Sequence, residues 1–143
     1  MHKSHLHKNS EFILESLKKH NLKATGPRKA ILKVLIGEHG PFTAEEIHHR
    51  ITKKICDLAT VYRCVINMEK VGLLRKCDFG DGTARYEMVE DGHHHHHVIC
   101  TSCKKVEPLA DCNLENINRF AQKKGFSNVT HSLEFFGLCK DCA

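Results

Sequence analysis

Two pairs of cysteines are the residues of this chain best suited to chemistry. Cys100 and Cys103 form one Cys-x-x-Cys pair, and Cys139 and Cys142 form a second pair after 35 intervening residues. Each pair can present two thiolates to one ion, and four thiolates complete the tetrahedral coordination of a structural zinc site. We expect this zinc site to tie the two ends of the second part of the chain together, so that metal binding contributes to folding.

A run of histidines leads directly into the first cysteine pair. The sequence reads HHHHHVIC from residue 93 to residue 100. Successive side chains of an extended segment point to opposite faces, so His94 and His96 would face one way, and His95 and His97 the other. One short run can therefore supply imidazoles to two different metal sites. The alternative is a flexible loop that binds metal weakly.

The composition indicates where this chemistry takes place. The start, MHKSHLHKNS, is polar, and the 143-residue sequence has eight cysteines. It lacks the apolar core of a signal peptide and any apolar run near the roughly 20 residues that span a bilayer. We therefore expect a cytoplasmic protein without a membrane segment, in which cysteines are thiolates or metal ligands rather than disulfides.

Charge is distributed unevenly along the chain. Residues 1–88 carry 16 Lys and Arg against 10 Asp and Glu, whereas residues 89–143 carry 6 against 7. A basic part joined to a slightly acidic part predicts that the basic part faces a polyanion such as nucleic acid. The alternative is an ordinary solvated surface.

The basic part contains four helical patterns followed by alternation. The first pattern lies in residues 11–20, the second opens at Pro27, and the third begins at Thr43 with a capping box. The fourth runs from Asp57 to Gly72, after which the apolar period changes to that of two strands around a tight turn at Asp81-Gly82.

Short helices followed by a β-hairpin indicate a winged helix-turn-helix, in which the helix before the hairpin enters the major groove. The outward face of that helix would carry Thr60, Tyr62 and Arg63. Their hydroxyl, phenol and guanidinium groups suit contacts with bases and phosphates. The alternatives are that Tyr62 packs against the wing and that Arg63 pairs with a nearby acid.

The second part of the chain predicts a small α/β unit. Residues 113–125 fit a helix that Gly125 ends, and residues 126–139 read as a strand. An unpaired strand edge in such a unit commonly pairs with a second copy, so we expect a homodimer. The fold class is then α+β, with a winged-helix DNA-binding domain at 1–88, a hinge at 89–92, and an α/β dimerisation and metal-binding domain at 93–143.

The chain resembles the Fur superfamily of bacterial metal-dependent transcriptional regulators over nearly its whole length. The matching segments are LKATGPRKAILKVL, TAEEIHHRI, LATVYRCVINMEKVGLL, YEMVEDGHHHHHVICTSC, NLE and VTHSLEFFGLCKDC. The resemblance implies a homodimer that binds an AT-rich palindromic operator in double-stranded DNA. It places Tyr62 and Arg63 on the helix that reads DNA, and structural zinc on the four cysteines.

The resemblance also implies two further metal sites. One lies in the dimerisation domain and uses His94, His96, Glu115 and His131. The other is linked to the hinge and uses Glu87, His95 and His97. Here the sequence departs from the family pattern, because Pro41 and Pro108 replace a histidine and an acidic ligand of iron-sensing members. Other candidate ligands for the hinge site are Cys77, Cys112, Glu107 and His39.

The choice of metal depends on these substitutions. A thiolate from Cys77 would favour Zn2+ over Fe2+, unless Cys77 and Cys112 are simply buried as small apolar groups. The segment VTHSLEFFGLCKDC is also similar to zinc-uptake regulators. The interpretation we favour is a Zur-like zinc sensor that represses metal-uptake genes when metal is plentiful. An iron-sensing ferric uptake regulator is the first alternative, and a peroxide sensor that uses bound Fe2+ is another.

Two functions outside the family fit the sequence less well. A metal-storage protein would not need the predicted DNA-binding helix and the β-hairpin wing that follows it. A small zinc hydrolase would need an open coordination position and a general base beside a substrate pocket, and the sequence has no His-Glu-x-x-His or His-x-Glu arrangement. We therefore do not expect an enzyme.

Overall fold

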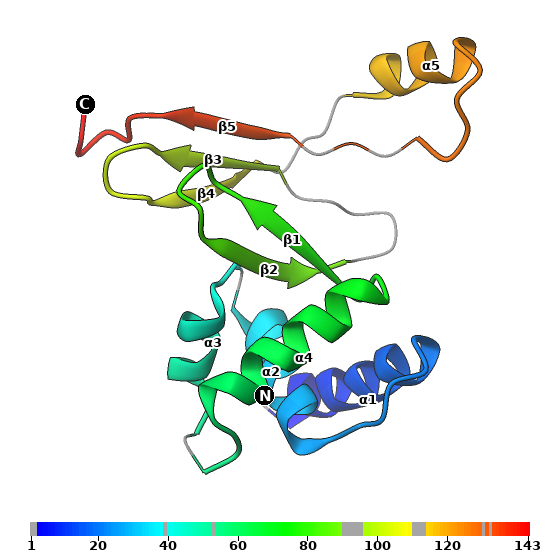
Figure 1. The fold of residues 1–143 in the computed structure, drawn as a ribbon, viewed down its shortest axis with the longest axis vertical. Helices are drawn as coiled ribbons and strands as arrows, with labels where there is room; N and C mark the ends of the chain where they lie inside the picture. Colours follow the sequence, from blue (N-terminus) through cyan, green and yellow to red (C-terminus); the bar gives the residue numbers. More distant parts are fainter. Residues whose placement is uncertain are drawn as a thin grey trace. The chain divides into compact units, whose positions relative to one another are not determined.

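A computed structural model of the chain describes residues 3–38, 40–52, 54–89, 96–109, 114–129, 131 and 133–143, with side chains from residue 9 onward. Within these residues the fold contains five helices and two small sheets (Figure 1). The chain divides into two compact units, Met1–Val89 and Glu90–Ala143. Among the described residues, none of the helices combines the length and the apolar character that crossing a membrane requires.

The first unit contains all four predicted helices. They are α1 (Lys3–Lys19), α2 (Gly26–Gly37), α3 (Ala44–Arg50) and α4 (Leu58–Lys70). The helix α1 begins well before the predicted segment. Pro27 lies in the first turn of α2, where a missing backbone N–H costs nothing because the first N–H groups of a helix have no intrahelical partner.

Side-chain caps fix where α3 and α4 begin. The Thr43 hydroxyl accepts a hydrogen bond from the Glu46 backbone N–H at 3.1 Å, and the Glu46 carboxylate accepts one from the Thr43 N–H at 2.8 Å. The predicted capping box is therefore confirmed. The Asp57 carboxylate accepts from the Thr60 N–H at 2.8 Å and caps α4. At the other end, Gly72 adopts a φ of 81°, which favours glycine and ends the helix.

A two-stranded antiparallel hairpin follows α4. Its strands are β1 (Leu74–Asp78) and β2 (Ala84–Met88). The two strands predicted around Asp81-Gly82 are confirmed, but they are joined by the five-residue loop 79–83 and not by a tight turn. The loop is held internally, because the Asp81 carboxylate accepts hydrogen bonds from the Thr83 backbone N–H at 3.1 Å and from the Arg85 guanidinium at 2.8 Å.

The core of the first unit orients α4. Val61, Val65 and Met68 of α4 are completely buried, in agreement with the helical pattern predicted from Asp57 to Gly72. They pack with fully buried side chains from the other helices, namely Leu17, Ile31, Leu32 and Ile47. Because one face of α4 is fixed in this core, the opposite face, which carries Tyr62 and Arg63, is exposed.

The second unit is built on a three-stranded sheet. Its elements are β3 (His96–Cys100), β4 (Val106–Leu109), α5 (Glu115–Lys123) and β5 (Glu134–Gly137). The strand order is β4-β3-β5, with β4 antiparallel and β5 parallel to β3. The sequence did not predict β4, since Pro108 argues against a strand. Pro108 is tolerated there because β4 lies at the sheet edge. The predicted helix (α5) and the two predicted strands (β3 and β5) are present, although β5 is shorter than expected.

Candidate metal centre and nucleic-acid interface

Four cysteines converge in the second unit. Cys100 ends β3, and its register partner in the parallel pairing is Gly137 at the end of β5, so the turns that follow both strands lie side by side. The Sγ atoms of Cys100, Cys103, Cys139 and Cys142 all lie within 4.8 Å of one another. The Sγ atoms of Cys103 and Cys139 are 3.7 Å apart. A tetrahedral zinc ion with Zn–S bonds of about 2.3 Å places its ligand sulfurs about 3.8 Å apart, so this cluster fits a zinc ion.

Backbone donors prepare this cluster for metal. The Cys139 N–H donates to the Sγ atom of Cys100 at 3.4 Å. The N–H groups of Cys139 and Cys103 hold the pKa of Cys100 well below its ordinary value, at about 6. A hydrogen bond from the Cys142 thiol lowers the pKa of Cys139. These contacts favour the thiolate, which is the form of cysteine that binds metal, at Cys100 and Cys139. Hydrogen bonds with the other three cysteine side chains instead raise the pKa of Cys103 to about 11.

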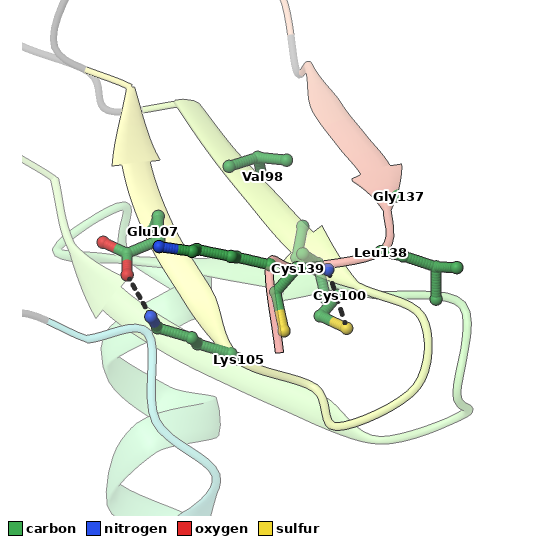
Figure 2. A pocket seen from close by; sticks show the side chains of 9 residues that line it. Val98, Cys100, Lys105, Glu107, Gly137, Leu138 and Cys139 are labelled. Carbon is green, nitrogen blue, oxygen red and sulfur yellow. Dashed lines mark hydrogen bonds and ion pairs between the residues drawn. The ribbon is translucent and has the colours of Figure 1, made fainter. Parts of the chain in front are cut away.

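A pocket of about 270 Å³ lies beside the cysteine cluster (Figure 2). Val98 and Leu138 contribute apolar side chains to its wall. Glu107 of β4 also lines it and forms an ion pair with Lys105 at 3.0 Å. The structure therefore places Glu107, a predicted candidate for the hinge site, in this pocket next to the four cysteines.

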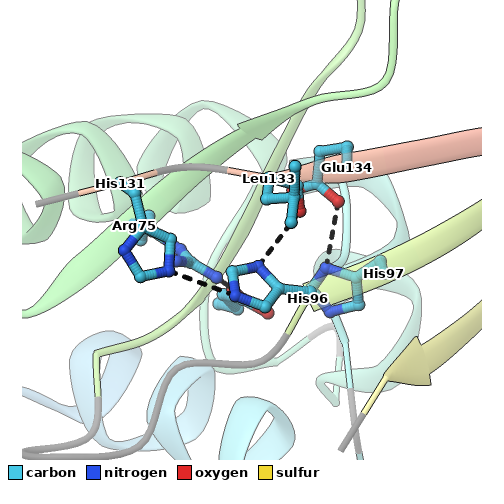
Figure 3. A network of polar contacts seen from close by, with 7 residues as sticks. Arg75, His96, His97, His131, Leu133 and Glu134 are labelled. Atoms are coloured by element: carbon cyan, nitrogen blue, oxygen red, sulfur yellow. Dashed lines mark hydrogen bonds and ion pairs between the residues drawn. The ribbon is translucent and has the colours of Figure 1, made fainter. Parts of the chain in front are cut away.

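Two histidines of the second unit face each other (Figure 3). The Nε2 atom of His96 lies 3.2 Å from the Nε2 atom of His131. Two imidazoles on a tetrahedral zinc ion, with Zn–N bonds of 2.0–2.1 Å, have their nitrogens about 3.4 Å apart. The Nδ1 atom of His96 lies 3.1 Å from the Leu133 carbonyl oxygen. A carbonyl that accepts the Nδ1 proton leaves Nε2 for a metal, so this pair fits half of a metal site.

The exposed face of α4 carries the predicted DNA-contacting residues. The Tyr62 hydroxyl donates to the Glu45 carboxylate of α3, and this hydrogen bond lowers the pKa of Glu45. The Arg63 guanidinium donates to the Thr60 hydroxyl at 3.3 Å. The face thus presents a phenol and a guanidinium whose present partners lie on the surface, where a nucleic acid can replace them.

Comparison with known proteins identifies the family. The Ferric uptake regulator family matches residues 19–136. The peroxide-responsive repressor PerR of Staphylococcus saprophyticus is 33% identical over 135 residues, covering 92% of this chain and 90% of that protein. This chain belongs to the ferric uptake regulator (Fur) family. Members of this family are metal-dependent transcriptional regulators, and the chain is therefore a metal-binding, DNA-binding regulator.

Solved structures agree with this assignment. The ferric uptake regulator Fur of Helicobacter pylori, whose structure has three functional metal binding sites, is 30% identical with a TM-score of 0.73. The match covers 96% of this chain and 93% of that one. The Campylobacter jejuni peroxide stress regulator is 32% identical with a TM-score of 0.71, over 91% and 98% of the two chains. The fold is thus that of Fur proteins.

The structure does not assemble every metal ligand expected of a Fur protein. Glu115 of α5 has a side chain that is 78% exposed and lies 3.5 Å from Arg119. Among the described residues, the four cysteines alone bring three or more possible ligand atoms within 4.8 Å of one another. Glu115 is therefore not part of the His96–His131 pair in this structure. Four of the other predicted ligands lie outside the described residues, namely His39, His94, His95 and Cys112.

The other predicted ligands of the hinge site are buried or form contacts with neighbouring side chains. Glu87 of β2 accepts a hydrogen bond from the Arg75 Nε atom of β1 at 3.0 Å, and Cys77 of β1 is buried. In the second unit, His97 is buried with its Nδ1 atom 3.4 Å from the Glu134 carboxylate. Sequence reasoning missed Glu134. The available signal was a single acid within the otherwise apolar segment LEFFG.

Proposed function

We propose that this Fur-family protein is a metal-responsive repressor that binds operator DNA as a metal-loaded homodimer and controls metal-uptake genes. The observation that carries the proposal is that the same chain contains two features. One is a helix, α4, with an exposed face suited to DNA, and the other is a set of separate groups of metal-binding side chains. We assign DNA binding to residues 1–88, the hinge to 89–92, and dimerisation with metal binding to 93–143. The operator is an AT-rich palindrome in double-stranded DNA.

The exposed face of α4 and the basic charge support the DNA-binding part of this proposal. Residues 1–88 have a surplus of Lys and Arg, which attracts the phosphate backbone. Tyr62 and Arg63 stand on the face of α4 that the core leaves exposed, and Thr60 lies beside Arg63. Because a homodimer presents two such helices, it reads half-sites one helical turn apart, about 34–36 Å.

Exposed apolar side chains of the second unit support the homodimer. Phe120 and Ile117 of α5 are each 63% exposed, and further exposed apolar residues follow, namely Phe126, Phe135, Phe136 and Leu138. Large exposed apolar surfaces mark interaction sites. In addition, β5 lies at an edge of the sheet, where main-chain groups can pair with another chain. A second copy of this chain would cover some of these side chains.

For the metals, we propose structural Zn2+ at the four cysteines and regulatory Zn2+ in a Zur-like sensor. His94, His96, Glu115 and His131 are proposed ligands of one further site, for which Glu115 has to approach the histidine pair. The other regulatory ligands are Glu87, His95, His97 and Cys77. A thiolate from Cys77 supports zinc, since soft ligands suit Zn2+ better than Fe2+. The similarity to PerR supports a second candidate, a peroxide-responsive repressor that uses Fe2+.

The deciding experiment measures DNA binding at controlled metal levels. Fluorescence anisotropy would measure binding of the protein dimer to an AT-rich palindromic duplex. The structural zinc site is loaded beforehand, and the concentration of free Zn2+ or Fe2+ is then raised under anaerobic conditions. Metal should tighten binding about 5- to 150-fold, the range of allosteric couplings. A response to zinc alone supports the zinc sensor. A response to Fe2+ that hydrogen peroxide reverses supports the peroxide sensor, and a peroxide-insensitive response supports an iron sensor. If neither metal changes the affinity for DNA, the proposal is contradicted.

Arg63→Ala should weaken operator binding by about 1–3 kcal/mol if the guanidinium reads a base. Lys18→Ala, which removes an exposed positive charge from α1, is the control for a general charge effect and should change operator binding much less. If both substitutions weaken operator binding equally, or if Arg63→Ala has no effect, α4 is not part of the DNA interface. Both variants are measured on the operator and on a scrambled duplex of equal length.

Glu45→Gln should tighten DNA binding about two- to fivefold. The carboxylate of Glu45 accepts a hydrogen bond from the Tyr62 hydroxyl, so it lies where phosphates would approach. Glutamine keeps an acceptor for the hydroxyl but removes a negative charge, whose screened effect is about 0.5–1 kcal/mol. The gain should shrink at high salt. Glu15→Gln on the exposed side of α1 is the control, and an equal gain there would show a general charge effect instead.

A further inference from the structure

His97 and Glu134 form a buried pair inside the second unit. They are register partners in the parallel pairing of β3 with β5. The His97 Nδ1 atom lies 3.4 Å from the Glu134 Oε2 atom, and the two side chains are 2% and 12% exposed (Figure 3). Burying a carboxylate is unfavourable unless a partner compensates for its lost hydration. This carboxylate is therefore placed where its interaction with the imidazole matters.

The adjacent histidine also has its Nδ1 atom beside an oxygen, in a shorter contact that is a hydrogen bond, whereas His97 and Glu134 form an ion pair that lacks hydrogen-bond geometry. The Nδ1 atom of His96 faces the carbonyl oxygen of Leu133 at 3.1 Å, and the Nδ1 atom of His97 faces the side chain of the next residue, Glu134. Figure 3 shows both Nδ1 atoms directed toward the start of β5. Because neighbouring residues of a strand point to opposite faces, the two rings are oriented separately, and each has its Nε2 atom turned away from its Nδ1 contact.

An acceptor at Nδ1 controls what Nε2 can do. A carboxylate or carbonyl that accepts the Nδ1 proton fixes the neutral tautomer with its lone pair on Nε2, holds the ring in place and makes Nε2 more basic. For His96 this acceptor is a backbone atom, which substitution cannot remove. For His97 the group that faces Nδ1 is a side-chain carboxylate, and its contribution can be measured.

We propose that Glu134 is a positioning residue for the regulatory metal. Its carboxylate holds His97 as the Nδ1-protonated tautomer and so sets the affinity of the Nε2 atom for a divalent cation. Glu134 itself does not bind the metal. The inference rests on the proposed role of His97 as a ligand, and it adds a residue that the sequence analysis did not identify.

The test uses the full-length dimer with structural zinc loaded. Glu134→Gln should lower the affinity for the regulatory metal about tenfold, and Glu134→Leu up to about 100-fold, as found for other outer-shell partners of metal ligands. Affinity is measured by competition for Zn2+ with a chromophoric chelator, and coordination by the visible spectrum of bound Co2+. Glu38→Gln, which removes the carboxylate of the Arg50–Glu38 ion pair in the first unit, is the matched control. Glu134→Asp should restore part of the affinity.

A second readout does not involve metal binding. Nitrogen-15 NMR of the imidazoles should show His97 protonated at Nδ1 in the parent protein and a mixture of tautomers in Glu134→Gln. A purely structural role would leave the tautomer unchanged in any variant that retains its fold and structural zinc.

The outcomes separate this inference from the proposed function. If His97→Ala weakens metal binding but Glu134→Gln changes neither affinity nor tautomer, the positioning role is wrong and His97 remains a proposed ligand. If His97→Ala itself keeps full affinity, His97 is not a ligand, and the inference is overturned together with that assignment. A tenfold loss in Glu134→Gln with an altered tautomer, and no loss in Glu38→Gln, supports the positioning role.

Discussion

Cys139→Ser should release the structural zinc and unfold the second unit. Cys139 lies 3.7 Å from Cys103 and supplies the N–H that donates to Cys100, so it connects both cysteine pairs. Structural zinc sites contribute about 10–16 kcal/mol of apparent binding free energy, whereas a whole domain is stable by only about 5–15 kcal/mol. The sheet β4-β3-β5 is small and many of its neighbouring apolar side chains are exposed, which leaves little other stabilisation once the metal is lost.

Zinc content and thermal unfolding would measure this effect. The variant should lose about one zinc ion per chain, and the second unit should lose its cooperative unfolding transition. The helices of the first unit should still unfold cooperatively. A strong chelator should reproduce the result in the parent protein. Cys64→Ser is the matched control, because Cys64 is a half-buried cysteine of α4 outside the cluster. A Cys139→Ser protein that keeps its zinc and both transitions would rule out a structural role for the cluster.

Local signals were sufficient to predict the first unit. The capping box at Thr43 and the Asp57 cap act within one helical turn, and the apolar period of α4 identifies its buried face. Such features depend on neighbours in sequence, so they can be recognised without the fold. The loop 79–83 was the exception, because the interactions of Asp81 with Thr83 and Arg85 stabilise a longer connection than the turn residues suggested.

The second unit shows what sequence patterns miss. The matched cysteine spacing was enough to predict a cluster across 35 residues, because metal coordination requires specific ligand types and numbers. The burial of Glu134 depends instead on the register between β3 and β5, which no local pattern fixes. Similarly, β4 forms although Pro108 lowers its strand propensity, since pairing with β3 needs no N–H donor from an edge residue at that position.

Phe120→Glu should disrupt the proposed homodimer without unfolding the chain. The Phe120 side chain is 63% exposed within the second unit, so a charge there costs little in the isolated subunit. In a dimer that covers this surface, the same charge would be buried without a partner, and the loss of such an aromatic contact typically costs about 2–4 kcal/mol. The dimer dissociation constant should rise about 30-fold or more. Operator affinity should fall with it, because a palindrome requires two reading helices.

Phe12→Glu makes the matched comparison. Phe12 is a 46% exposed phenylalanine of α1 in the first unit. The substitution Phe12→Glu therefore introduces the same charge outside the proposed interface and should leave the dimer intact. Sedimentation equilibrium would measure the oligomeric state, and anisotropy the operator binding, both with structural zinc retained. If Phe120→Glu stays dimeric, α5 does not contribute to the interface. If instead it becomes monomeric but still binds the palindrome at full affinity, the reading helices act independently, and metal could not control DNA binding through their spacing.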